Sequence, residues 1–236
     1  MTTTSTLPDD FGRAFVTRVR EALSGSADAL GDLDRRAGDG DFGTNIRTAM
    51  TLLKKNVEDD DPDGYREWLT ALYMAWLGVG GTSGPLFGMF FRDLAKAADA
   101  QSPGTGGGDP ASEQGGPTPA QFGDALAAGQ ATVQKYGEAK VGDKTMVDAL
   151  DPAVAALREA LEAGKDAAAA FGAAEQAAVD AARSTAETTA RRGRASYVGE
   201  ASEGVIDPGA AAMALVIGAS RAAAEGTETV ETSWIA

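Results

Sequence analysis

Apolar residues recur every third or fourth position through nearly the whole sequence, which is the pattern of amphipathic α-helices. The stripes are Phe15–Val19–Leu23, Leu30–Leu33, Ile46–Met50–Leu53, Trp68–Leu72–Trp76–Val79, Leu86–Phe90–Leu94 and Met146–Leu150–Val154–Leu157–Leu161. We take the Leu30–Leu33 stripe as a second helix that ends before Gly38. The alternation of β-branched and polar residues that is typical of strands is absent, so we expect an all-α protein.

Two further segments complete this outline. Residues 166–190 are rich in alanine, which favours a helix and allows neighbouring helices to approach closely. Residues 101–119 are rich in glycine, proline and serine without periodicity, so we expect a flexible surface loop between two helices. Helices of similar length joined by short loops predict a bundle or closed helical barrel. A length of 236 residues fits a single domain over residues 1–236.

The composition excludes several kinds of chemistry. The chain has no cysteine and no histidine, which rules out disulfides, thiolate nucleophiles, imidazole acid–base catalysis and phosphohistidine intermediates. Chemistry must therefore use carboxylates, amides, hydroxyls, lysine, arginine or a hard metal such as magnesium, calcium or manganese. The net charge of −14 argues against nucleic acid as a partner, although a bound metal would let an acidic chain bind phosphates.

The sequence also lacks membrane signals. No apolar run approaches the roughly 20 residues of a membrane-spanning helix. The N-terminal residues MTTTSTLPDD have neither the basic nor the apolar segment of a signal peptide. We therefore expect a cytoplasmic protein without a membrane partner.

Three aspartates lie close together in a glycine-rich turn over residues 34–45. Asp39 and Asp41 are two residues apart and can point the same way, while Asp34 can reach them from the end of a helix. Such carboxylates repel one another unless a cation lies between them, so this turn predicts a divalent-metal site that holds phosphates. A turn that only caps the next helix is the alternative that these residues alone leave open. The glycine spacing in 38–43 follows a helix rather than a strand, so we do not expect a dinucleotide-binding fold.

A second glycine-rich segment, residues 78–85, lies between two helical stripes. Ser83 is a candidate N-cap, and Pro85 suits the first turn of the following helix. Exposed backbone amides at such a helix start bind phosphate well, whereas an ordinary capped turn is the alternative interpretation.

Two more segments have features of helix starts. Residues 141–146 contain a Gly-x-Lys-Thr fragment without the complete P-loop spacing, and Asp143 could cap the following helix. Asp207 followed by Pro208 is typical of a helix N terminus. Arg194, a little upstream, is a candidate partner for a phosphate group.

Taken together and in order, these segments resemble the L subunit of bacterial dihydroxyacetone kinase, which is the nucleotide-binding subunit. The matching text is LDRRAGDGDFGTN, VGGTSGPLFGMFF, VGDKTMVDAL and GRASYVGEASEGVIDPGA. Four motifs in one order are far more specific than any one alone. The resemblance implies a closed barrel of about eight antiparallel amphipathic helices, with the nucleotide at one open end.

The resemblance also implies which residues form the site. Asp34, Asp39 and Asp41 would bind the metal, which the resemblance implies is two Mg²⁺ ions. No catalytic residue is assigned in this chain. The nucleotide, ADP or ATP, would contact Phe42, Gly43, Thr44, Asn45, Thr82, Ser83, Gly137, Met146, Arg194, Asp207, Pro208 and Gly209. Phe42 departs from the family, which commonly has histidine at this position.

The function implied by the resemblance is transfer of a phosphoryl group from a Mg²⁺-bound adenine nucleotide to a short ketose, such as dihydroxyacetone. A separate substrate-binding subunit would present the ketose. The donor is left open between ATP and an ADP that a phosphotransferase-system phosphocarrier rephosphorylates. Alternatives are a kinase for a fatty acid or for another short sugar such as erythrulose, and a nucleotide-loaded subunit that regulates a transcription factor. A homodimer is also left open.

Overall fold

The computed structural model describes residues 6–99, 116–197 and 199–235, and every regular element in these ranges is helical. The α-helices are α1 (Phe11–Ala37), α2 (Phe42–Asp60), α3 (Tyr65–Leu77), α4 (Ser83–Ala95), α5 (Pro119–Gly137), α6 (Met146–Glu162), α7 (Ala167–Ser184) and α8 (Pro208–Glu225). The prediction of an all-α protein with about eight helices is confirmed.

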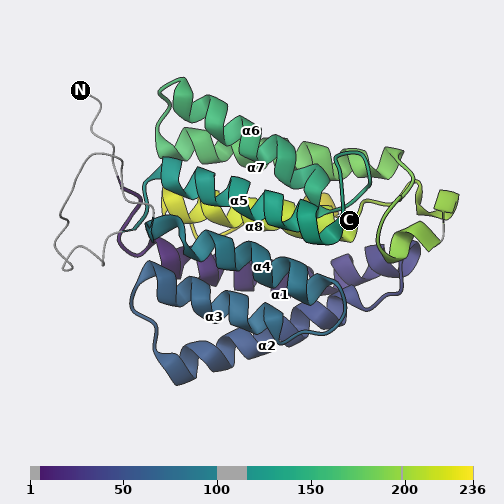
Figure 1. The fold of residues 1–236 in the computed structure, drawn as a ribbon, viewed down its shortest axis with the longest axis horizontal. Helices are drawn as coiled ribbons and strands as arrows, with labels where there is room; N and C mark the ends of the chain where they lie inside the picture. The colour runs from purple at the N-terminus through teal and green to yellow at the C-terminus, as the bar shows by residue number, and fades with distance from the viewer. Residues whose placement is uncertain (1–5, 100–115, 198, 236) are drawn as a thin grey trace.

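The helices form a closed ring in which each one packs against the next in the chain (Figure 1). The ring closes because α8 packs against α1 as well as against α7. Since consecutive helices run antiparallel, the even-numbered helices α2, α4, α6 and α8 all begin at one end of the barrel. This end is on the right in Figure 1.

The N-terminal stripe of apolar residues forms one helix rather than the predicted two. Helix α1 continues through Gly25 and the Leu30–Leu33 stripe to Ala37. Gly31 lies where α2 crosses closely, because a Cβ atom added to Gly43 would be 3.1 Å from the Gly31 Cα and 2.6 Å from the Ala27 carbonyl oxygen. The glycines therefore permit close helix packing here instead of ending a helix.

Helix α8 is buried on all sides, whereas the predicted barrel helices are amphipathic. All but four of its 18 residues are buried, and it packs against α1, α6 and α7. An apolar surface all round is what a helix needs when other helices surround it. Alanine dominates this helix, so its neighbours can approach closely from several directions.

Aromatic side chains close the end of the barrel that lies opposite the starts of the even-numbered helices. The rings of Phe11, Phe15, Phe122 and Phe171 lie 5.3–6.2 Å apart between centroids, and all four side chains are buried. This packing fills one end of the barrel, so a cavity can form only toward the other.

Two predicted boundaries are wrong in detail. The loop expected over residues 101–119 lies outside the described residues up to position 115, and Pro119 already belongs to α5, with Thr118 as its N-cap. The alanine-rich helix ends at Ser184 and is followed by a short 3₁₀ turn, Thr185–Glu187. No helix in the described part of the chain is long and apolar enough to cross a membrane.

Candidate functional site

A cavity of about 430 Å³ opens at the end of the barrel where the even-numbered helices begin. Its size falls within the roughly 300–1,000 Å³ of small-molecule sites. All of the predicted site residues line it except Gly43 and Thr44. These lining residues are Asp34, Asp39, Asp41, Phe42, Asn45, Thr82, Ser83, Gly137, Met146, Arg194, Asp207, Pro208 and Gly209.

Helix N termini surround this cavity, but they differ in how their amides are satisfied. Helices α6 and α8 are capped by the side chains of Thr145 and Asp207, whereas α2 and α4 have no side-chain cap. Uncapped first-turn amides carry the positive end of the helix dipole and are suited to phosphate oxygens. The first amide of α2 donates to Asp34 instead, so among these four helix starts that of α4 is free to bind an anion.

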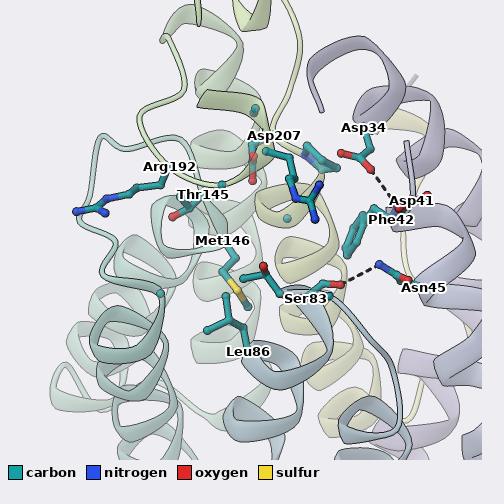
Figure 2. Close-up of a pocket in the computed structure, with 18 of the residues that line it drawn as sticks. Asp34, Asp41, Phe42, Asn45, Ser83, Leu86, Thr145, Met146, Arg192 and Asp207 are labelled. Atoms are coloured by element: carbon teal, nitrogen blue, oxygen red, sulfur yellow. Dashed lines mark hydrogen bonds between the residues drawn. The ribbon is translucent and has the colours of Figure 1, made fainter. Parts of the chain in front are cut away.

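The start of α4 depends on a glycine. Thr82 is its N-cap residue, one position before the predicted Ser83, and neither side chain caps the helix. A Cβ atom on Gly84 would be 2.1 Å from the Val79 carbonyl oxygen, so only glycine fits. Asn45 on α2 donates a hydrogen bond to the Ser83 hydroxyl at 3.2 Å, which links the two uncapped helix starts (Figure 2).

Carboxylates form one edge of the cavity. Asp34 is buried near the end of α1, and its Oδ2 accepts a hydrogen bond from the Phe42 amide at 2.9 Å (Figure 2). Asp39 accepts a hydrogen bond from the Asp41 amide at 3.3 Å and pairs with Arg194 at 3.2 Å. Burial raises the pKa of Asp34 above its ordinary value, and the charge of Asp39 raises it further.

The ligand chemistry of this edge fits Mg²⁺, which prefers carboxylate oxygens and keeps positions open for phosphate. Asp34 and Asp39 lie close enough for one to affect the pKa of the other. Among the described residues, however, no three acidic side chains are gathered as a metal-binding group. Asp41 is exposed, so its side chain would have to turn toward the other two to share an ion. The metal assignment stays a prediction.

The opposite wall of the cavity is apolar. Leu86 and Met146 lie on this wall, away from the aspartates (Figure 2), together with Val133. Phe42 lies toward the inside of the barrel, where its ring is 6.0 Å from that of Phe87, which stacks on Trp76 at 4.5 Å. Phe42 therefore contributes an amide to Asp34 and a ring to the aromatic core.

Two predicted contacts do not reach the cavity. Gly43 faces α1, and Thr44 is exposed on the surface of α2. Successive residues of an α-helix point about 100° apart, so four consecutive residues cannot all face one ligand. Phe42 and Asn45, three positions apart, share the face that borders the cavity.

Lys144, Thr145 and Arg192 also line the cavity and were not predicted as site residues. The Gly-x-Lys-Thr fragment is the sequence signal for Lys144 and Thr145, although it lacks the complete P-loop spacing. Asp143 does not cap α6. Thr145 does so, in a reciprocal capping box with Asp148, while Asp143 accepts a hydrogen bond from the Lys140 amide at 2.9 Å.

Lys144 is the most unusual of these residues. Its side chain is 1% exposed, and its backbone lies in the left-handed region with φ of 62°. Its ammonium group donates hydrogen bonds to the carbonyl oxygens of Thr188 at 2.9 Å and Ser202 at 2.6 Å. Burial lowers the pKa of Lys144, while the charges of Asp207 and Glu203 raise it.

An eight-helix barrel whose helix starts and carboxylates meet in one cavity defines a helical domain with a phosphate-type site. The DAK2 domain model matches residues 36–222, and the chain belongs to this family. The predicted resemblance is thereby confirmed.

Known relatives agree with this assignment. The ADP-binding subunit of PEP-dependent dihydroxyacetone kinase 1 from Listeria innocua is 30% identical over 89% of this chain and 94% of its own length. L-erythrulose 1-kinase from Mycolicibacterium smegmatis is 36% identical over 80% of this chain but only 31% of its own length. The crystal structure of the dihydroxyacetone kinase from C. freundii with AMP-PNP and Mg²⁺ matches with a TM-score of 0.64 at 25% identity, over 91% of this chain and 34% of that one.

Proposed function

We propose that this chain is the nucleotide-binding subunit of a dihydroxyacetone-type kinase. It transfers a phosphoryl group from a Mg²⁺-bound adenine nucleotide to a short ketose that a partner subunit holds. The observation that carries the proposal is the cavity itself, which the uncapped start of α4 lines together with Asp34 and Asp39. The relatives named for ADP binding and dihydroxyacetone phosphorylation support the same assignment.

Each part of the cavity has a place in this function. The phosphates lie against the first-turn amides of α4, beside the hydroxyls of Thr82 and Ser83, and the Arg194 guanidinium adds a positive charge. The adenine lies against the apolar wall of Leu86 and Met146. Asp34, Asp39 and Asp41 would hold Mg²⁺, two ions as the family resemblance implies, and the bound metal would neutralise charge on the phosphates.

The acceptor and its activation come from the partner. Phosphoryl transfer relies mainly on positioning and charge neutralisation, so the chain needs no nucleophile of its own. The open end of the barrel is the face from which a partner-bound ketose reaches the phosphates. The donor is identified by supplying the purified complex either with ATP or with phosphoenolpyruvate and a phosphocarrier. The mixture in which the ketose is phosphorylated contains the donor.

The first test concerns the metal edge. Asp39→Asn keeps the size of the side chain but removes its charge, so Mg²⁺–ADP affinity should fall roughly 10- to 100-fold, from about 1.5–3 kcal/mol for a charged contact. Isothermal titration calorimetry measures the affinity. Asp60→Asn is the matched control, because Asp60 is exposed at the far end of α2. Unchanged Mg²⁺-dependent affinity in Asp39→Asn would overturn the proposed site.

A second substrate is favoured by one comparison, since the L-erythrulose 1-kinase is 36% identical to this chain. The test is to reconstitute the chain with its substrate subunit and to compare the turnover of dihydroxyacetone with that of L-erythrulose. The ketose that turns over faster is the preferred substrate. The same nucleotide site serves both, so the substrate subunit sets the preference.

A further inference from the structure

The chain leaves the barrel after the 3₁₀ turn that follows α7 and returns to it before α8. We call residues 188–202 the arginine loop, since it carries Arg192 and Arg194 to the cavity. The two ends of the loop lie side by side, because the Ala190 amide donates a hydrogen bond to the Ser202 hydroxyl at 2.9 Å. Closely spaced ends and this length are typical of an Ω-loop.

The base of the arginine loop is held by one side chain from another part of the molecule. The Lys144 ammonium donates to Thr188 O at one end of the loop and to Ser202 O at the other, over 2.9 and 2.6 Å. These bonds are made in a buried setting, where a charged donor is worth more than in water. The lysine therefore joins the two ends of the loop directly.

The backbone around Lys144 strengthens this attachment. The Arg191 amide donates to the Asp143 carbonyl oxygen at 3.0 Å, so the neighbouring residue binds the loop as well. Lys144 adopts a left-handed backbone conformation, which costs a non-glycine residue about 1 kcal/mol or more and persists where surrounding contacts demand it. That conformation lies directly before the start of α6, and the side chain reaches the loop from there.

The arginine loop in turn places a charge at the metal edge. Arg194 lies 3.2 Å from the Asp39 carboxylate, although its side chain is largely exposed. An exposed arginine has little to fix its position except its own backbone. The position of that backbone depends on how firmly the two ends of the loop are held.

We propose that Lys144 is a positioning residue that clasps both ends of the arginine loop and so sets Arg194 against the phosphates of the nucleotide, whereas Arg192 pairs with Glu138 at 3.4 Å. Lys144 itself does not bind the nucleotide. The effect on affinity rests on the proposed function, whereas the clasp is a property of the protein without ligand. The two are therefore tested separately.

Hydrogen exchange on the ligand-free protein tests the clasp. In Lys144→Met, backbone amides of residues 189–197 should exchange at least about tenfold faster, while those of α5 stay unchanged. Lys140→Met is the control, because Lys140 is exposed and its side chain does not line the cavity. Unchanged exchange in the loop of a folded Lys144→Met protein would overturn the clasp.

A chemical rescue covers the case in which the methionine variant does not fold. The chain has no cysteine, so Lys144→Cys introduces a single thiol that can be aminoethylated in denaturant before refolding. The product restores an ammonium group on a side chain of similar length. If the clasp is correct, the aminoethylated protein regains slow exchange in residues 189–197. The unmodified thiol form keeps fast exchange in the same residues.

A double-mutant cycle separates positioning from direct contact. Lys144→Met should weaken Mg²⁺–ADP binding about tenfold in the native background, but less than about twofold when Arg194 is replaced by alanine. Equal weakening in both backgrounds would mean that Lys144 contacts the nucleotide and would overturn the proposal. Failure of the native protein to bind Mg²⁺–ADP would contradict the proposed function, yet leave the exchange result as the test of the clasp.

Discussion

At the scale of single residues, Asp207 shows how burial decides the state of a side chain. Its carboxylate accepts a hydrogen bond from the Ala210 amide at 2.7 Å, and its own amide donates to the Thr185 hydroxyl at 2.8 Å. Burial raises the pKa of Asp207 to about 7 from an ordinary value of 3.8, while the Ala210 amide and the Lys144 charge oppose the shift. Asp207 therefore caps α8 at the cavity as a carboxyl group that is easily protonated.

This shift predicts how Asp207 affects stability with pH. Between pH 4 and 7 the unfolded chain has lost the Asp207 proton while the folded protein keeps it, so this group's stabilising contribution is lost as pH rises through about 7. Asp207→Asn retains the cap but does not titrate. The unfolding free energy of the variant minus that of the native protein should therefore be larger at pH 8 than at pH 4, by on the order of 2–4 kcal/mol.

Urea unfolding of both proteins across this pH range measures the difference. Asp166→Asn makes the same exchange at the exposed cap of α7 and controls for the loss of a charge at a helix start. A constant difference between Asp207→Asn and the native protein at every pH would contradict the raised pKa.

At the scale of elements, the turn from α3 to α4 sets the position of one phosphate-binding helix start. Val79 donates its amide to the Trp76 carbonyl, and Gly81 has a positive φ of 76°. Gly84 then packs directly on the backbone at the end of α3, where an added Cβ atom would lie 2.1 Å from Val79 O. The first turn of α4 can pack this closely against the end of α3 only because residue 84 has no side chain.

We therefore expect Gly84→Ala to displace the start of α4. It should lower the unfolding free energy by about 2–4 kcal/mol, which for a chain of this size lowers the melting temperature by roughly 5–12 °C. Mg²⁺–ADP affinity should fall as well. Thermal unfolding by circular dichroism and calorimetric titration measure the two effects.

Gly172→Ala provides a control of opposite sign. Gly172 lies inside α7 with nothing within 4 Å of an added Cβ atom, so alanine should stabilise the helix by about 0.5–1 kcal/mol. If Gly84→Ala also melted at or above the native temperature, the close approach of α4 to α3 would not require glycine at position 84.

At the scale of the whole molecule, a chain with a net charge of −14 is proposed to bind an anionic nucleotide. The barrel makes this possible because its antiparallel helices bring several N-terminal dipole ends to one cavity. The carboxylates of that cavity still oppose the phosphates unless a cation is present. Binding should therefore require Mg²⁺, and it should stabilise the folded barrel.

Thermal unfolding tests this dependence. At about 100 times its dissociation constant, Mg²⁺–ADP should add about 2.7 kcal/mol and raise the melting temperature by roughly 5–10 °C. ADP with EDTA should give little shift, and Asp39→Asn should respond weakly to Mg²⁺–ADP. An equal shift with ADP in EDTA would show that binding does not use the metal.

The family resemblance implied most of the residues expected around the cavity, and the sequence by itself determined the helical class and the order of the helices. Local patterns suffice for this: apolar spacing specifies a helix, and glycines with Asp207-Pro208 mark helix starts whose geometry depends on near neighbours. The four motifs in one order then identified the family. Such information lies in short stretches of chain and needs no knowledge of distant contacts.

The tertiary structure alone decided which of these residues meet and what each one does. Gly43 and Thr44 belong to the aspartate motif, yet the rotation of α2 turns one against α1 and the other to the surface. Lys144 looked like part of an incomplete P-loop, but its hydrogen bonds are to residues 44 and 58 positions away in the chain. Contacts at such separations depend on how the helices pack, and no local pattern in the sequence records them.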